Sequence, residues 1–224
     1  MPFPITATAQ ALDLAQALRL SPEGKKRLSR CEKMWSYRTY QGGDSATKID
    51  WRQSARTQEP VVRSHEGLSA RTVYLYATCG DEILRGKLYV LLLALADLLA
   101  GKERPIGWLS PERARITQTQ SLLPSLITEG FDATPEKSLF PTLPLTRSLL
   151  VIAGDLSQQT EAQITRLTTY AEQGTKGVYL DLATDGDTTK TFMPEGWLIL
   201  PFNKEADEES LLVELLDAAI TLSR

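Results

Sequence analysis

From residue 71 onward, short apolar runs alternate with longer helical stretches. The run 72–77 is rich in β-branched and aromatic residues, which favours a strand. The stretch 82–100 is apolar almost throughout and ends before Gly101, which predicts a long buried helix. Further strands are expected at 105–109, 114–117, 148–153, 177–182 and 197–200, and further helices at 119–128, 158–173 and 207–222.

Strands that alternate with helices in this way predict an α/β fold. We expect a mostly parallel six-strand sheet with helices on both faces, in which 114–117 pairs back as a short edge strand. In such sheets, ligands and partners bind beyond the carboxyl ends of the strands. The residues expected there are 77–81, 154–155 and 181–187.

The first 70 residues depart from this alternation. Residues 5–20 have the spacing of an amphipathic helix, which 21–24 either ends or follows with a new turn. Residues 35–66 are rich in Gly, Ser, Arg and single aromatics, which predicts brief strands and ordered loops. We therefore divide the chain into an N-terminal helical segment (1–29), a small β-containing subdomain (30–70) and an α/β domain (71–224).

Composition places the chain among ordinary globular proteins. With 224 residues and 42% hydrophobic content, it can bury a sizeable core without disulfides or metals. The N-terminus lacks the basic and apolar regions of a signal peptide, and the apolar run 88–100 is too short for a membrane span and contains Asp97. Two cysteines, Cys31 and Cys79, fit a reducing compartment, so we expect a cytoplasmic protein.

Charge is distributed unevenly along the chain. The segment 19–63 holds eleven Lys/Arg and five Asp/Glu, a net charge of +6, whereas the whole chain carries −3. Such asymmetry marks either an anion-binding face or a solvated face that is partly paired with acids of the same chain. For any single charge, the second interpretation is the better supported.

Residues 36–66 carry a specific set of motifs. They comprise an arginine with aromatics, a Gly-Asp pair, Ile-Asp-Trp-Arg, Ser-Ala-Arg and Val-Arg-x-x-Glu. The set closely resembles the signature of the bacterial family called domain of unknown function 58, and the resemblance extends over about residues 30–183. It implies a von Willebrand factor A-like (Rossmann-like) domain that serves as an adaptor or co-chaperone of a MoxR-type AAA+ ATPase. No enzymatic activity is established for that family.

Domains of the von Willebrand type often carry a metal-ion-dependent adhesion site with the pattern Asp-x-Ser-x-Ser. Here the corresponding loop places Ala77, Cys79 and Asp81 at the three ligand positions, while Asp155 matches a later aspartate. Alanine supplies no ligand, and a thiol suits Mg²⁺ poorly. The resemblance therefore implies a degenerate site, and we expect neither a metal nor a cofactor.

The resemblance directs attention to two groups of residues. We expect the partner to contact the loop face of Cys79, Gly80, Asp81 and Asp155, helped by Arg38, Arg52 and Arg56. The signature also has a structural interpretation, in which Asp50 forms a salt bridge beside a buried indole and charged residues join in one polar network. Its members are Asp44, Asp50, Trp51, Arg63 and Glu66. For Asp81 and Asp155, the alternative is helix capping at residues 82 and 158.

The motifs that carry chemistry are missing from the sequence. His65 is the single histidine, its neighbour Ser64 points to the opposite face of an extended chain, and no phosphate loop or zinc spacing occurs. We therefore predict that the protein is not an enzyme. The alternative to the adaptor is a nucleic-acid or anion binder that uses segment 19–63 with its aromatics Trp35, Tyr37, Tyr40 and Trp51. The overall acidity and the resemblance favour the adaptor.

Overall fold

The computed structural model divides the chain into two compact units. The larger unit combines Met1–Cys31 with Arg71–Arg224, and the smaller unit is Glu32–Ala70. The structure describes residues 5–29, 35–65, 71–102, 104–109, 114–131, 148–156, 159–182 and 193–222.

The larger unit is built on a six-strand sheet with the order β5-β4-β3-β6-β7-β8. Every neighbouring pair is parallel except β4 and β5, which are antiparallel. This confirms the predicted α/β fold, including the short edge strand. The strands are β3 (Val73–Ala77), β4 (Ile106–Leu109), β5 (Ala114–Thr117), β6 (Leu149–Gly154), β7 (Lys176–Asp181) and β8 (Leu198–Pro201).

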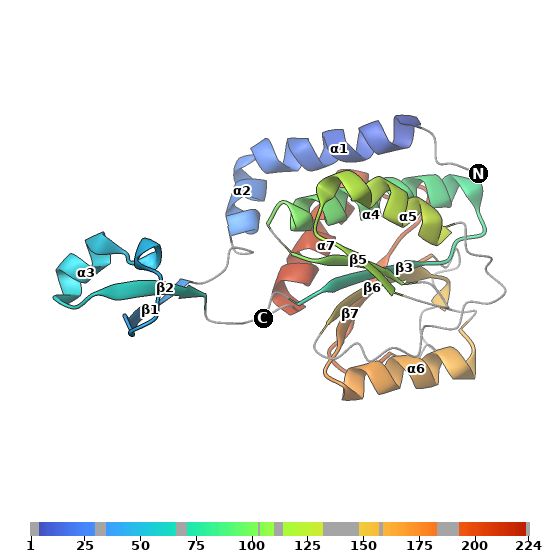
Figure 1. Ribbon diagram of the computed structural model, residues 1–224. Coiled ribbons are helices and arrows are strands. Elements are labelled where there is room, and N and C mark those ends of the chain that lie inside the picture. Colours follow the sequence, from blue (N-terminus) through green and yellow to red (C-terminus); the bar gives the residue numbers. More distant parts are fainter. Residues whose placement is uncertain are drawn as a thin grey trace. The chain divides into compact units, whose positions relative to one another are not determined.

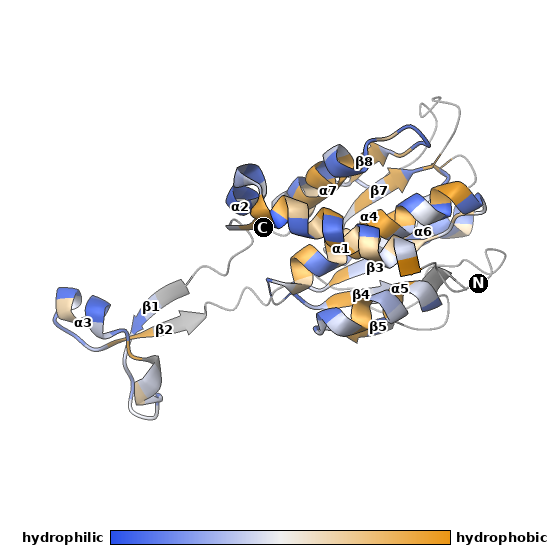
Figure 2. Ribbon diagram, turned by 90° about the horizontal axis from the view of Figure 1, so that it is seen from above, coloured by the Kyte–Doolittle hydropathy of each residue, from blue (hydrophilic) through white to orange (hydrophobic). Residues whose placement is uncertain are grey.

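Helices cover both faces of this sheet (Figure 1). Four helices lie on one face: α1 (Ile5–Leu20), α4 (Glu82–Ala100), α5 (Leu123–Phe131) and α7 (Glu208–Leu222), while α6 (Glu161–Glu172) covers the other. The short helix α2 (Pro22–Ser29) follows α1 and is among the hydrophilic stretches in Figure 2. No helix within the described ranges is long and apolar enough to cross a bilayer.

The core explains why the apolar runs are continuous rather than alternating. In β6, Val151 belongs to the cluster under α4, whereas Leu150 and Ile152 belong to the cluster under α6, so a strand covered on both faces is apolar at every position. Helix α4 is buried from residue 88 to residue 100 because the sheet lies on one side and α1 on the other. Small residues at Ala7, Ala11 and Ala15 form the buried face of α1.

Two helices differ from the sequence prediction. The helix expected at 119–128 is instead a short 3-10 turn, η2 (Gln120–Leu122), followed by α5, whose first turn contains Pro124. Proline lacks an N–H and fits the first turn of a helix, so the α-helix starts next to it rather than running through it. The helix expected at 158–173 begins only at Glu161, because Thr160 and Gln163 form a capping box there.

The smaller unit is a two-strand ribbon with one helix. Strand β1 (Trp35–Thr39) pairs antiparallel with β2 (Val61–His65), and η1 (Ala46–Lys48) and α3 (Trp51–Thr57) lie between them in the chain. Helix α3 is a correction, because only strands and loops were predicted here. Ser54 joins α3 to β2: its hydroxyl donates to the Asp50 carbonyl (2.8 Å) and accepts from the Val61 N–H (2.9 Å).

Candidate functional site

The carboxyl ends of β3 and β6 form the topological switch point of the sheet. From β3 the chain proceeds to β4 on one side, whereas β6 is followed by β7 on the other, and crevices arise where the order diverges. The two ends are held together because the Thr78 N–H donates to the Ala153 carbonyl at 2.9 Å. A Cβ at Gly154 would lie 3.1 Å from the Thr78 hydroxyl oxygen and 2.8 Å from that of Tyr179, so glycine is needed there.

Asp81 uses both of its carboxylate oxygens within the chain. Oδ1 accepts from the N–H groups of Ile83 (2.9 Å) and Leu84 (3.0 Å), which caps α4, and Oδ2 lies 2.7 Å from Lys204 Nζ. The bond from Lys204 and the backbone donors hold the pKa of Asp81 below its usual value. Lys87 in turn donates to the Lys204 carbonyl at 2.6 Å. The capping alternative is therefore confirmed for Asp81, and Lys204 is a partner that the sequence prediction missed.

Asp155 follows β6 and is half-buried. The capping alternative placed a helix at residue 158, which lies outside the described residues; the helix found here, α6, begins at Glu161 and is capped by Thr160. The neighbouring backbone is ordered by another carboxylate: buried Asp181, at the end of β7, accepts from the Leu156 N–H at 3.1 Å. Thus the structure brings Asp155 to the same strand edge as Asp81, as predicted, but gives the two aspartates different surroundings.

Cys79 is a half-buried thiol that donates to the Asp81 carbonyl at 3.3 Å. Burial raises its pKa, so the thiol stays protonated near neutral pH and is a poor nucleophile. Burial likewise raises the pKa of Tyr179 well above its usual range. In the part of the chain that the structure describes, no three His, Cys, Asp or Glu side chains are grouped to hold a metal ion.

In the smaller unit, Arg38 serves the local fold. Its guanidinium makes two bonds to Asp44, at 2.7 Å and 2.5 Å, and the Asp44 carboxylate also accepts from the Gln41 N–H at 2.9 Å. The bond to Asp44 raises the pKa of Arg38. The Arg38–Asp44 pair thus fixes the turn after β1, which agrees with the structural interpretation of these two residues.

The predicted burial of Trp51 is wrong. Asp50 caps α3 through the Gln53 N–H (3.1 Å) and accepts from the Tyr37 hydroxyl (3.3 Å), rather than lying beside a buried indole. Trp51 is the first residue after the cap and is 68% exposed. The remaining predicted network members, the Arg63 side chain and Glu66, lie outside the described residues.

Helix α3 therefore presents an aromatic and basic surface. Ser54 faces inward, whereas Trp51, Arg52, Ala55 and Arg56 are exposed. We call these four residues the α3 face. Among the described residues, no acidic side chain forms an ion pair with Arg52 or Arg56. All three arginines of the predicted partner-binding set are thus exposed, but Arg38 is engaged with Asp44.

The basic segment 19–63 is not one continuous basic face. Arg19 belongs to the larger unit and pairs with Asp97 at 2.6 Å, and Arg27 pairs with Asp217 in the same unit. Arg38 pairs with Asp44 within the smaller unit. Internal pairing, the better supported of the two interpretations of this charge, therefore holds for three of these arginines.

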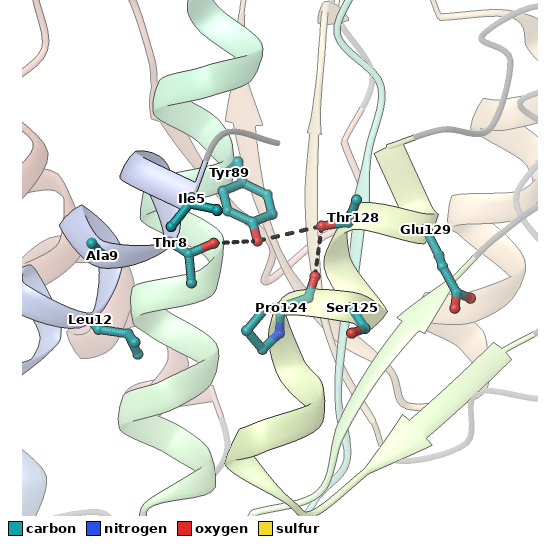
Figure 3. A pocket seen from close by; sticks show the side chains of 9 residues that line it. All are labelled: Ile5, Thr8, Ala9, Leu12, Tyr89, Pro124, Ser125, Thr128 and Glu129. Carbon is teal, nitrogen blue, oxygen red and sulfur yellow. Dashed lines mark hydrogen bonds between the residues drawn. The ribbon is translucent and has the colours of Figure 1, made fainter. Parts of the chain in front are cut away.

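An open groove of about 570 Å³ lies between α1, α4 and α5 (Figure 3). At its base, the Tyr89 hydroxyl lies 3.2 Å from that of Thr8 and accepts from Thr128 at 3.5 Å. Exposed Ile5 and Leu12 belong to its α1 wall. The hydroxyls are bonded to one another, so the groove is mainly an apolar depression. No pattern in the sequence indicated this groove.

Comparison with known families adds one finding. Residues 36–80 match the family model described as "Protein of unknown function DUF58". The match covers α3, β2, β3 and all of β1 but Trp35. It therefore includes the whole α3 face and ends within the first loop of the switch point, just before Asp81. The match supports the predicted resemblance over residues 36–80, which are part of the predicted range of about 30–183. No curated protein matches the chain.

Proposed function

We propose that this protein is a non-catalytic, von Willebrand factor A-like interaction domain that acts as an adaptor or co-chaperone of a MoxR-type AAA+ ATPase. The observation that carries the proposal is the α3 face. It lies in the segment that matches the family model, and it exposes a tryptophan beside two arginines. Tryptophan and arginine are enriched among the residues that dominate binding energy at protein interfaces.

The composition of the smaller unit supports this role. Among its described side chains, the buried apolar ones are Val61 and Val62, while Tyr37 is 47% exposed and Trp51 more so. A two-strand ribbon with so little buried surface gains little stability from its own core. Covering Trp51 with a partner would remove a large apolar area from water, which favours association.

The switch point supports a non-catalytic role. Asp81 is engaged as a helix cap and in a pair with Lys204, and these bonds keep its pKa below the usual value, which makes it a weak general base. The thiol of Cys79 is protonated near neutral pH. The degenerate adhesion site implied by the resemblance is consistent with a domain that recognises its partner without a metal.

The proposal is tested by direct binding. The purified chain and a MoxR-type ATPase from the same genome are titrated in a calorimeter, with and without ATP. We expect binding that Trp51→Ala weakens at least about tenfold, as is typical for a central interface tryptophan. Leu122→Ala is the matched control, because it removes a different exposed apolar side chain (56% exposed) from the larger unit. Lack of binding, or equal loss with both variants, would refute the proposal.

A further inference from the structure

We infer that the α3 face is a docking surface for an acidic segment of a partner protein, in which two carboxylates pair with Arg52 and Arg56 and an apolar side chain packs against Trp51. The inference deepens the proposed function, since it rests on the partner being a protein and specifies the chemistry that this partner presents. It applies to any protein that carries such a segment.

The first argument is charge. Arg52 and Arg56 are exposed, and no described acid pairs with either. The nearby aspartates are already engaged: Asp44 binds Arg38, and Asp50 caps α3 and accepts from Tyr37. The α3 face thus offers two guanidinium groups, which form strong bidentate bonds with carboxylates.

The second argument is spacing. Arg52 and Arg56 are four residues apart on one helix, so their Cβ atoms lie about 5–6 Å apart on the same side. Carboxylates at alternate positions of an extended segment are about 6.6 Å apart, and those four residues apart on a helix are about 5–6 Å apart. Either form of acidic segment can engage both arginines at once, and Trp51, next to Arg52, provides an adjacent apolar contact.

The third argument separates a protein from a nucleic acid. Tight nucleic-acid binding neutralises many phosphates, typically about 6–10. The α3 face itself carries two cations, Arg52 and Arg56. A short segment with a few carboxylates and an apolar side chain fits this surface better.

The test uses the full chain labelled with ¹⁵N and observes the indole N–H signal of Trp51, assigned by its disappearance in Trp51→Phe. The probe is a 12-residue peptide of Asp and Glu with one central Phe, at physiological salt. The comparison peptide has Lys in place of every acid. We expect the acidic peptide to shift the Trp51 signal and the basic peptide to leave it unchanged. The double variant Arg52→Glu with Arg56→Glu should weaken binding at least tenfold.

The matched control reverses the same amount of charge elsewhere. Lys25→Glu with Lys26→Glu alters two exposed lysines of α2 and should leave binding within twofold of the original. Unchanged signals from the rest of the protein show that each variant is folded. The inference is overturned by no shift with the acidic peptide, by equal loss in both double variants, or by tighter binding of a 12-nucleotide oligothymidine at the same site.

The outcomes also separate this inference from the proposed function. If the chain binds the peptide through Arg52 and Arg56 but does not bind the ATPase, the proposed function alone is refuted. If the double variant Arg52→Glu with Arg56→Glu binds the ATPase as well as the original chain does, the inference alone is refuted. The part of the fluorescence that Trp51→Phe removes adds a check on the unbound chain: if a soluble quencher does not reduce this part, then the rest of the chain or a second copy covers Trp51, and the inference fails.

Discussion

Asp97 is a carboxylate within the buried stretch of α4, and its partners are Arg19 and Gln120. Its Oδ2 lies 2.6 Å from the Arg19 guanidinium, and its Oδ1 accepts from Gln120 at 2.9 Å. Asp97 is only 5% exposed, so removal of the arginine leaves a buried charge without its counterion. We expect Arg19→Met to lower the free energy of unfolding by about 3 kcal/mol, as measured by urea denaturation.

The control for this prediction is a more exposed ion pair. Arg27 pairs with Asp217, and solvent reaches both side chains. Arg27→Met should therefore cost less than about 1 kcal/mol, since screened pairs contribute little. If both variants lower the free energy of unfolding by the same amount, the burial of Asp97 does not determine how strongly this ion pair stabilises the packing of α1 on α4.

Asp81 gives a prediction about pH. Its folded pKa is lowered, so the stability that its charge contributes is present above the unfolded-state pKa and is lost as pH falls through the folded pKa. Asp81→Asn keeps a good capping residue but removes the charge beside Lys204. We expect the wild-type chain to have a higher urea midpoint than the variant at neutral pH. This difference should begin to shrink below about pH 4, near the unfolded-state pKa, and disappear once the pH is below the folded pKa of Asp81. A difference in urea midpoint that does not change with pH would contradict a stabilising charge interaction between Asp81 and Lys204.

For single residues, the sequence predicted the capping role of a residue such as Asp81 better than its ion pair with a residue that is distant along the chain. Asp81 followed by a long apolar stretch signals a cap, and the structure contains it. The Lys204 partner carried no such signal, because its position depends on where the chain returns after β8. Likewise, a buried indole was predicted at Trp51, and nothing in the local sequence indicated that this side chain would be exposed.

Among the elements, two glycines differ in what surrounds them. A Cβ at Gly177 in β7 would overlap with the Trp197 ring, whereas a Cβ at Gly86 in α4 would meet open space. We expect Gly177→Ala to lower the free energy of unfolding by about 1–3 kcal/mol through overpacking. Gly86→Ala should raise it by about 0.5–1 kcal/mol, because alanine favours helix. Thermal unfolding of the two variants measures both changes. Shifts of the melting temperature in the same direction would contradict the described surroundings of Gly177 and Gly86.

The elements of the sheet were predictable because their patterns are strong. All ten strands and helices expected from 71 to 224 occur, with α5 and α6 displaced as described, since continuous apolar runs leave little choice of structure. Helix α3 was not predictable in this way. It is short and mostly polar, and it depends on the Asp50 cap and on the Ser54 bonds to β2. Local hydrogen bonds, rather than periodicity, decide its structure.

For the whole molecule, the two units should differ in stability. Strand β6 lies within the sheet and is buried at every position, whereas the smaller unit buries few of its described side chains. We expect backbone amides of residues 35–65 to exchange with deuterium at least tenfold faster than those of β6, because exchange follows local opening. Mass spectrometry of the intact chain after timed exchange measures this. If the amides of residues 35–65 exchange as slowly as those of β6, the smaller unit must be stabilised by more than its internal contacts.

The order of the units along the chain has a consequence for biosynthesis. The larger unit is assembled from two stretches, Met1–Cys31 and Arg71–Arg224, with the smaller unit between them. Helix α1 therefore leaves the ribosome well before α4, the helix that its alanine face covers. At about 5–20 residues per second, translation of the intervening chain takes several seconds. Throughout that interval the alanine face of α1 lacks the helix that buries it in the folded protein, so the larger unit can complete its core only after the smaller unit has been synthesised.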